Sequence, residues 1–267
     1  MNDFKIKYGT TALVAGASEG MGAAFAEALA QRGLDLVLIA RRMDVLETFA
    51  EQLRNQYKIN VQSIACDLAD VDVVKQLKDQ LGDLEINFLV YNACLSYIGP
   101  FLNADVSEHT RIAAVNMITP IKMLHYFGGK MVEKSNGGIV VMSSMAGLQG
   151  SGYLSTYGAT KAFDKIIAEG LWYEWKPKGV DVIACCAGAT TTPNYIQTKP
   201  LKVSFFAPKP QQPAEVVEEC LNRIGTVPSF ISGRSNRFAS FIMQKLLPAK
   251  ASVNIMGDTT KKMYRIG

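Results

Sequence analysis

The chain has 267 residues, of which 48% are hydrophobic and 19% charged, a balance typical of a globular protein with a large core. No stretch approaches the roughly 20 apolar residues that a membrane-spanning helix needs. The first residues lack the apolar core of a secretory signal, so we expect a cytoplasmic protein. The five cysteines are odd in number and have no metal-ligand spacing, which predicts buried thiols in a reducing compartment and no metal site.

The net charge of +4 is unevenly distributed along the chain. From Lys199 onward there are 11 Lys and Arg against 4 Asp and Glu, a balance of +7, which leaves −3 for the remainder (4 − 7). Such an excess could serve an anionic substrate, a membrane surface or nucleic acid, but a diffuse excess is more often a solvated surface. We expect no nucleic-acid partner. The amphipathic stretch 238–247 keeps membrane contact open as an alternative, although a core, lid or oligomer contact is the commoner role.

The first predicted elements are a strand, a glycine-rich turn and a helix. The apolar run 10–15 predicts the strand, and apolar residues at helical spacing from Met21 onward predict the helix. In the turn, Gly16 permits a sharp bend, Gly20 lets the backbone approach a pyrophosphate, and Gly22 lets the helix pack on the strand. The helix N-terminus then faces the anion. The candidate phosphate-binding residues are Gly16, Ser18, Gly20, Met21 and Gly22.

The second predicted strand, 34–40, ends without the acidic residue that favours NAD in such strand–helix–strand units. Ala40 stands at that end, and Arg41 and Arg42 follow it. Two guanidinium groups suit the 2′-phosphate of NADP(H), because arginine binds phosphate in a planar, bidentate manner. The alternative is that both arginines only form a basic start to the next helix. We favour NADP(H) as the cofactor.

The middle of the chain continues to alternate helices and strands, which are predicted over 44–57, 61–66, 86–91 and 107–134. Asp67 and Leu68 follow one of these strands, and Asn92 follows the other. An Asp at such a position can bind the adenine amino group or simply cap the next turn. The long helical stretch contains Asn116 and Pro120, which are poor helix-interior residues, so we expect a kink with a freed backbone carbonyl there.

The next stretch brings together a hydroxyl, a phenol and an ammonium. A buried strand predicted over 139–142 leads to Ser144, and a helix predicted over 157–175 carries Tyr157 and Lys161. Residues four apart project from the same helix face, and a nearby cation lowers the pKa of a phenol. Tyr157 is therefore the candidate proton donor and acceptor, with Ser144 placed to hydrogen-bond a substrate oxygen.

The spacing of tyrosine and lysine is not specific by itself. It occurs at Tyr126 and Lys130, at Tyr157 and Lys161, and at Tyr195 and Lys199. A half-buried tyrosine beside a solvated lysine is the better interpretation of the first and third pairs. Only the middle pair follows a strand that ends in two serines, and Ser155 or Thr156 can cap its helix.

The remaining elements are predicted as strands over 180–186 and 229–232, a helix over 213–224 and a helical extension over 234–267. The segment 189–213 follows the carboxyl end of a strand, where open α/β sheets bind ligands, so we expect a substrate lid there. Its bulky residues indicate an apolar carbonyl substrate; with a neighbour from the earlier loop they are Tyr153, Tyr195, Ile196, Phe205 and Phe206. The whole pattern predicts a single-domain, Rossmann-like α/β fold with a doubly wound parallel sheet of about seven strands.

These residues together resemble the short-chain dehydrogenase/reductase family over essentially the whole chain. The matching positions are Gly16, Gly20, Gly22, Asp67, Asn92, Asn116, Ser144, Tyr157 and Lys161. The resemblance implies a ketone or aldehyde interconverted with an alcohol by hydride transfer with NADP(H), with Tyr157 exchanging the proton. It also implies that Lys161 binds the nicotinamide ribose and tunes Tyr157, that Asn116 holds a water, and that Gly188, Thr190 and Thr192 contact the cofactor. A homodimer or homotetramer is expected.

Several segments are similar to bacterial NADP-dependent 7β-hydroxysteroid dehydrogenases, namely 91–95, 143–145, 157–163 and 191–193. This similarity makes a hydroxysteroid one substrate option. Two alternatives remain: a nucleotide-binding regulator without activity, and a lipid or steroid carbonyl reductase associated with a membrane surface. Three positions depart from the family pattern: Cys94 replaces a glycine, Ala187 replaces a proline, and Glu19 stands where NADP-preferring members often have a basic residue.

Overall fold

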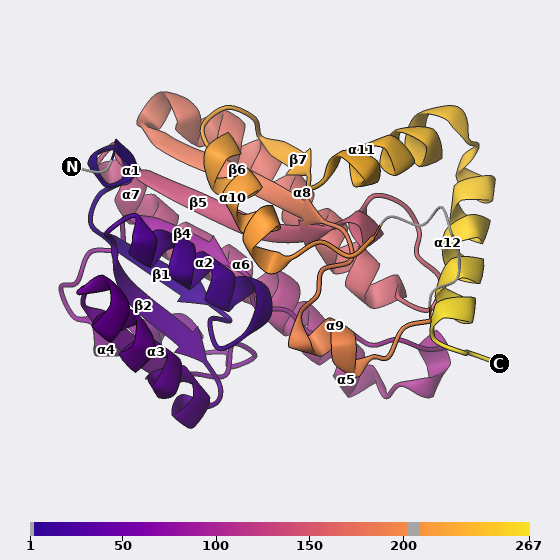
Figure 1. The fold of residues 1–267 in the computed structure, drawn as a ribbon, viewed down its shortest axis with the longest axis horizontal. Coiled ribbons are helices and arrows are strands. Elements are labelled where there is room, and N and C mark those ends of the chain that lie inside the picture. The colour runs from indigo at the N-terminus through magenta and orange to yellow at the C-terminus, as the bar shows by residue number, and fades with distance from the viewer. Residues whose placement is uncertain (1–2, 202–208) are drawn as a thin grey trace.

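The computed structural model describes residues 3–201 and 209–267 (Figure 1). Within these residues, seven parallel strands form one sheet in the order β3-β2-β1-β4-β5-β6-β7. The strands are β1 (Thr11–Ala15), β2 (Asp35–Ala40), β3 (Val61–Ala65), β4 (Phe88–Tyr91), β5 (Gly137–Ser144), β6 (Val180–Ala187) and β7 (Ser229–Ile231). The prediction of a doubly wound parallel sheet is confirmed.

The strand order reverses between β1 and β4. Ala15 at the end of β1 aligns with Ile39 in β2 on one side and with Tyr91 in β4 on the other. All five residues of β1 are buried, as expected for a parallel strand that is covered on both faces. Open α/β sheets bind ligands outside the carboxyl ends of the strands at such a reversal, so the fold itself marks this edge.

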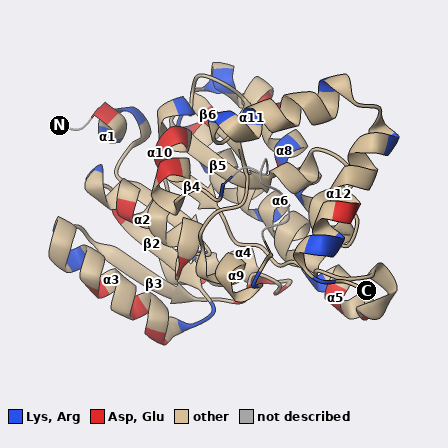
Figure 2. Ribbon diagram, turned by 45° about the vertical axis from the view of Figure 1, so that its right-hand side comes forward, with Lys and Arg blue, Asp and Glu red and all other residues tan. Residues whose placement is uncertain are grey.

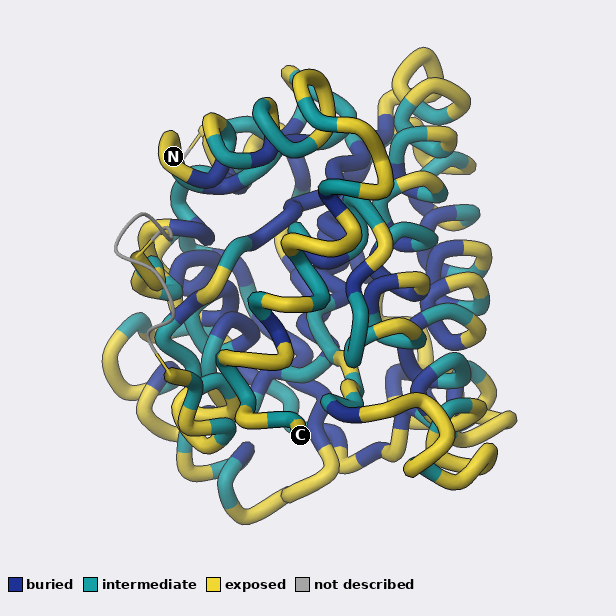
Figure 3. The backbone as a smooth tube through the Cα atoms, turned by 90° about the vertical axis from the view of Figure 1, so that its right-hand side faces the viewer, coloured by how far each residue is buried: buried dark blue, intermediate teal, exposed yellow. Residues whose placement is uncertain are grey.

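Helices cover both faces of the sheet. One face carries α2 (Gly20–Gln31), α3 (Met43–Tyr57) and α10 (Pro213–Arg223), and the other carries α4 (Val73–Leu81), the α5–α7 stretch and α8 (Ser155–Trp175). Successive residues of β1 point into different cores, since Val14 packs on the α2 side and Leu13 on the α8 side. Figure 3 shows the buried segments inside these two layers and the exposed ones at the outer turns.

The helical stretch predicted over 107–134 is present but irregular. It consists of α5 (Val106–Ala113), the π-helical segment Ala114–Ile118, α6 (Thr119–Met123), a second π-helical segment Leu124–Gly128 and α7 (Gly129–Glu133). Asn116 lies in the first π-helical segment. Pro120 has no N–H to donate to the carbonyl of Asn116, four residues earlier. The expected irregularity at these two residues therefore takes the form of a widened turn, a feature that is frequent at functional sites.

Sequence reasoning missed three helices, which are α1 (Asp3–Tyr8), α4 and α9 (Pro193–Gln197). The expected caps of α8 are also wrong, because the helix begins at Ser155 itself and the cap position is Leu154, which makes no side-chain cap bond. Of the five thiols, Cys94 is exposed and the other four are buried. The expected lid residues Phe205 and Phe206 lie outside the described residues.

The C-terminal segment forms α11 (Arg234–Phe241), a π-helical segment (Ile242–Leu246) and α12 (Ala249–Met263). These helices lie beyond the carboxyl edge of the sheet (Figure 1). A Cβ added to Gly152, in the loop before α8, would stand 3.1 Å from the Cα of Gly257 in α12. Figure 2 shows that α12 carries both signs of charge. Among the described helices, none has the length and apolarity to cross a membrane.

Candidate active site

The glycine turn connects β1 to α2 at the reversal of strand order. Gly16 has φ of 81° and Gly20 has φ of 61°, both in the left-handed region that favours glycine. Gly22 lies against the carbonyl group of Gly16, where any Cβ would collide. Each of the three predicted glycines therefore has a steric reason to be glycine.

The first turn of α2 is open to an anion. Glu19 is the N-cap residue and makes no side-chain cap bond, so it leaves the N-terminal N–H groups available at the positive end of the helix dipole. Ser18 is half-buried in the turn, whereas Met21 is buried, so only the backbone of Met21 can serve a ligand. A Cβ on Gly20 would meet the side chain of Thr192 at 3.0 Å, which places the start of the predicted lid beside the turn. The geometry fits the pyrophosphate of a dinucleotide.

The two arginines after β2 have different surroundings. Both Arg41 and Arg42 are exposed. Arg42 forms an ion pair with Glu19, with Nη2 and Oε2 3.1 Å apart. Arg41 has no hydrogen bond or ion pair among the described residues, and its charge helps to lower the pKa of Asp67. Arg41 is therefore the arginine that is free to meet a ligand.

Asp67 is exposed at the end of β3, and both of its carboxylate oxygens have partners. Oδ1 accepts a hydrogen bond from the N–H of Ala69 at 2.9 Å, and Oδ2 accepts one from Arg111 at 2.7 Å. The bond from Ala69, followed by that from Arg111, lowers the pKa of Asp67. The capping alternative is thus realised, and an adenine amino group would share an acceptor with these donors. Leu68 is buried, and its carbonyl accepts from Thr119 at 2.6 Å.

Residues from other parts of the chain hold the segment that follows β6 in place. Gly188 lies against Asn236 of α11, which leaves no room for a Cβ. Thr190 forms a parallel bridge with Gln211, and Asn236 donates to Gln211 at 3.1 Å. At the end of β4, the side-chain amide of Asn92 donates to the carbonyl of Gly16 at 3.0 Å and so joins β4 to the glycine turn. All the strand-end residues predicted to bind the cofactor therefore lie along one edge of the sheet.

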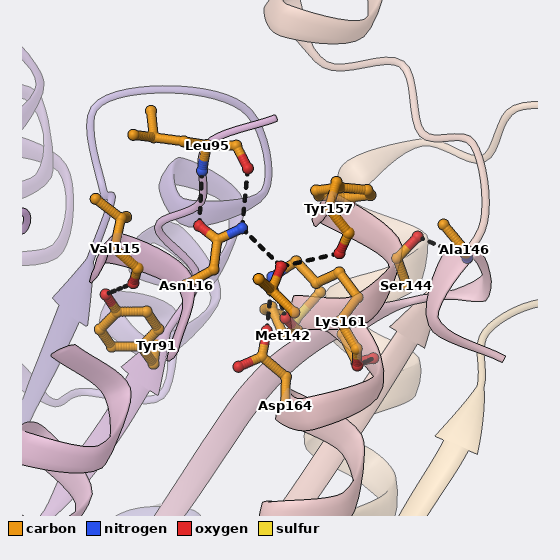
Figure 4. Close-up of polar contacts among 12 residues, drawn as sticks. Tyr91, Leu95, Val115, Asn116, Met142, Ser144, Ala146, Tyr157, Lys161 and Asp164 are labelled. Carbon is orange, nitrogen blue, oxygen red and sulfur yellow. Dashed lines mark hydrogen bonds and ion pairs between the residues drawn. The ribbon is translucent and has the colours of Figure 1, made fainter. Parts of the chain in front are cut away.

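The hydroxyl, phenol and ammonium meet at the end of β5 and the start of α8 (Figure 4). Partial burial raises the pKa of Tyr157 to about 12, and the nearby Cys94 adds to this, whereas Lys161 and a hydrogen bond with Ser144 act to lower it. The expected net lowering of this pKa is wrong, because burial outweighs the pull of the ammonium, which stands 5.9 Å from the ring centroid.

Lys161 has a partner that sequence reasoning did not identify. Its Nζ donates to the carbonyl of Met142 at 2.7 Å and to the carboxylate of Asp164 at 2.9 Å, and the side chains of both ionic partners are buried. Burial acts to lower the pKa of Lys161, but Asp164, Cys94 and Tyr157 together outweigh it and raise that pKa. The signal available in the sequence was an acidic residue three positions after the lysine on the same helix.

Asn116 connects the π-helical segment to two other parts of the site. Its Oδ1 accepts from the N–H of Leu95 at 2.8 Å, and its Nδ2 donates to the carbonyl of Leu95 at 2.9 Å and to Thr160 at 3.0 Å. The amide is engaged on both sides and completely buried. A water placed by this residue would therefore bind the backbone carbonyl that Pro120 cannot engage.

The profile of the short chain dehydrogenase family matches residues 10–201. The chain belongs to the short-chain dehydrogenase family. A 7β-hydroxysteroid dehydrogenase of Clostridium sardiniense is 30% identical over 235 residues, which cover 88% of this chain and 90% of that one. A solved 7β-hydroxysteroid dehydrogenase structure superposes with a TM-score of 0.89 at 27% identity and covers 96% of this chain and 100% of that one. A Sphingobium yanoikuyae short-chain dehydrogenase in complex with NADPH has a TM-score of 0.75 at 27% identity, and the match covers 93% of this chain and 96% of that one.

The departures from the family pattern leave Ser144, Tyr157 and Lys161 in place. Cys94 is exposed directly after the strand end that carries Asn92. Ala187 is the last residue of β6, so that strand continues to the residue before Gly188. Within the described residues, no cluster of three or more His, Cys, Asp or Glu is arranged to hold a metal ion.

Proposed function

We propose that this chain is an NADP(H)-dependent oxidoreductase that reduces a bulky apolar ketone, with hydroxysteroid-like compounds as the first substrate class to test. The observation that carries the proposal is the placement of Ser144, Tyr157 and Lys161 on the sheet edge that also holds the glycine turn. One edge thus offers both an anion site and a proton donor. When bound, the cofactor supplies a hydride to a carbonyl carbon.

The residues of this chain divide the remaining work. Ser144 donates a hydrogen bond to the carbonyl oxygen and fixes its position. Tyr157 gives its proton to the same oxygen as negative charge develops there. Lys161 has three N–H donors, of which Met142 and Asp164 take two, so one remains for a ribose hydroxyl. The N-terminal N–H groups of α2 hold the pyrophosphate.

Three observations support NADP(H) over NAD(H). β2 ends in Ala40 without a carboxylate, Arg41 is unengaged, and a solved relative is a complex with NADPH. Glu19 acts against this preference, because its carboxylate pairs with Arg42 and leaves that guanidinium less available to a phosphate. The preference for NADP(H) therefore depends mainly on Arg41.

The substrate class rests on aromatic residues near the start of α8 and on the relatives. Tyr97, Phe101 and Tyr153 line a small hollow together with His109, Ser155 and Thr156, the last two of which immediately precede Tyr157 in the chain. Burial raises the pKa of Tyr195 of α9, and the nearby Tyr264 adds to this. Both the Clostridium sardiniense relative and the superposed structure are 7β-hydroxysteroid dehydrogenases. A rigid, apolar ketone fits this aromatic environment better than a polar sugar.

The test is NADPH consumption with a panel of ketones: a 7-keto steroid, bulky aryl ketones and a small sugar ketose as the polar control. We expect turnover with at least one apolar ketone and little with the ketose. Tyr157→Phe serves as the catalytic control. Binding of NADPH without turnover of any ketone or alcohol would refute the proposal. It would favour the alternative of a nucleotide-binding regulator without activity.

A further inference from the structure

Helix α11 packs with polar residues inward and with its large apolar residues outward. Asn236 and Ser240 are buried, at 2% and 5% exposure, whereas Phe238 and Phe241 are 67% and 54% exposed. A surface helix of a globular protein normally has the reverse arrangement, with its apolar residues against the core. Packing within the chain therefore does not explain the two phenyl rings.

Hydrogen bonds and an ion pair fix this orientation of α11. The side-chain amide of Asn236 donates to Gln211 at 3.1 Å and to the carbonyl of Ser232 at 2.8 Å. Arg237 pairs with Glu219 of α10, with the two atoms 2.6 Å apart. A rotation of the helix that turned the phenyl rings inward would break these contacts. The rings are thus held on the outside by the polar side of the same helix.

The exposed side of α11 carries positive charge and no negative charge. Arg234, Phe238 and Phe241 are four and three positions apart and share one side of the helix. The π-helical segment that follows adds the exposed Lys245 and Leu246. We call these five residues the basic aromatic face. The side chains of Arg234 and Lys245 have no hydrogen bond or ion pair with any described residue.

The surroundings of this face reinforce its positive charge. The sequence has no Asp or Glu between Glu219 and Asp258, and five Lys and Arg stand in that interval. Figure 2 shows Lys and Arg but no Asp or Glu along the ribbon of α11. A cation near exposed aromatic and aliphatic side chains favours a partner that is both apolar and anionic.

An anionic lipid surface has both properties. A helix that lies in a membrane interface buries its apolar side chains at the headgroup boundary, and its Lys and Arg meet anionic headgroups. A second copy of the chain fits less well, because a two-fold contact would bring the same cations of both copies together. Since no described helix has the length and apolarity to cross a membrane, the contact is peripheral.

We propose that the basic aromatic face docks the chain on membranes that contain anionic phospholipid, with Phe238 and Phe241 inserted at the headgroup boundary and Arg234 and Lys245 bound to headgroups. Docking itself does not depend on the proposed function, but its use in turnover rests on it. An apolar ketone concentrates in lipid, so a docked reductase meets more of its substrate.

Helix α12 connects the docking face to the candidate active site. It begins shortly after Leu246, and a Cβ added to Gly150, in the loop between β5 and α8, would stand 3.1 Å from the side chain of Val253. Near the other end of α12, the carbonyl of Met263 accepts from the N–H of Leu201, in the expected lid, at 2.9 Å. The face that docks is therefore rigidly linked to both segments that border the substrate.

The first test is flotation of the full chain with vesicles, without cofactor or ketone. We expect binding to vesicles of phosphatidylcholine and phosphatidylserine, little binding to pure phosphatidylcholine, and release at high salt. Phe238→Ser combined with Phe241→Ser should weaken binding by about tenfold or more, because both rings lose their burial in lipid. Lys245→Gln should weaken it by about fivefold, the usual contribution of one basic residue near an anionic surface.

Matched controls lie at the opposite edge of the sheet. Val71, in the segment after β3, is 76% exposed but stands between Asp70 and Asp72. Lys58, at the end of α3, is also exposed. Val71→Ser and Lys58→Gln should leave vesicle binding unchanged. If the double phenylalanine variant does not fold, Phe241→Ser alone and Lys245→Gln decide the matter.

The second test locates the contact. The fluorescence of Phe241→Trp should shift to shorter wavelength when anionic vesicles are added, whereas that of Val71→Trp should not. No binding to anionic vesicles, or full binding by the folded double variant, would overturn the proposal. An oligomer that becomes a monomer in the double variant, without vesicle binding by the unsubstituted protein, would show that a second copy covers this face. Neither test measures turnover, so docking and ketone reduction can fail separately.

Discussion

The guanidinium of Arg42 lies 3.1 Å from the carboxylate of Glu19, so an acidic residue of the glycine turn engages one of the two arginines that follow β2. Both side chains are about half exposed, and the pair contributes little to stability in that setting. The pair matters instead for how the chain recognises the phosphate of a cofactor. A phosphate that reaches this corner meets one free guanidinium, that of Arg41, and one that is already paired.

Arg41→Ala should therefore weaken NADPH binding about tenfold or more, because one charge-assisted contact is worth roughly 1.5–3 kcal/mol. NADH binding should hardly change, since NADH lacks the 2′-phosphate. Titration of nucleotide fluorescence measures both. Arg42→Ala is the matched control and should have a smaller effect, because the Arg42 guanidinium is already paired with Glu19. Equal affinity of the unsubstituted protein for NADPH and NADH would contradict the cofactor assignment.

Tyr157→Phe removes one hydroxyl and keeps the ring, so the fold and NADPH binding should survive. The rate of ketone reduction should fall by roughly 10²–10⁴, the usual contribution of a positioned acid. The chain supplies its own controls in Tyr126 and Tyr195, which also precede a lysine by four positions. Lys130 lies 4.9 Å from the ring centroid of Tyr126, so proximity of an ammonium is not the distinguishing feature.

Single-turnover kinetics of the three phenylalanine variants separate these cases. Tyr126→Phe should leave the hydride-transfer step unchanged, and Tyr195→Phe should alter KM more than kcat. Near-full turnover by Tyr157→Phe on a good ketone would exclude this tyrosine as the proton donor, however well the glycine turn matches the family.

The outer face of α8 predicts how the chain assembles. Ile166 and Tyr173 are 63% and 78% exposed, and they stand seven positions apart on one side of this helix. Large apolar side chains at such exposure favour a partner surface, and we infer that α8 packs against its copy across a two-fold axis. Ile166→Glu should convert the oligomer to a monomer in light scattering. A monomeric unsubstituted protein at micromolar concentration would contradict the inference.

The glycine turn and the tyrosine–lysine pair could be predicted because both are local. Gly16 and Gly20 need left-handed backbone and Gly22 needs the absence of a side chain, and these requirements are properties of a strand–turn–helix unit. The doubly wound parallel sheet of about seven strands could be predicted from the alternation of elements and from the handedness rule for parallel crossovers.

The surroundings of the site could not be predicted because they depend on residues far apart in the sequence. Asp67 is bound by Arg111, 44 positions later, and Gly188 is enclosed by Asn236 of α11. Asp164 lies three positions from Lys161, but this spacing fixes only the side of the helix. Whether that side is buried, and hence whether the ion pair perturbs the phenol, depends on how α8 packs on β5.

A last prediction concerns the anchoring of the C-terminal helices by Glu219 of α10. Its Oε1 lies 2.6 Å from Arg237 of α11, and its Oε2 accepts from the N–H of Gly233 at 2.9 Å and from Ser232 at 3.2 Å. Burial acts to raise the pKa of this carboxyl, but the bond from Gly233 and the charge of Arg237 together lower it. A lowered folded-state pKa stabilises the fold above the unfolded value of about 4.3, and this contribution is lost as the pH falls through the folded value.

Glu219→Gln should therefore lower the melting temperature at pH 7 by roughly 3–10 °C, since it weakens charge-assisted bonds worth about 1–3 kcal/mol in a chain of this size. The difference from the unsubstituted protein should shrink as the pH falls below about 4. Glu218→Gln is the neighbouring control: Glu218 pairs at 2.7 Å with Arg32, the residue that follows α2, and not with a residue of α11. Both variants should lose stability, but only Glu219→Gln should make α11 and α12 more sensitive to limited proteolysis. Equal sensitivity of the two variants would show that Glu219 does not anchor the C-terminal helices.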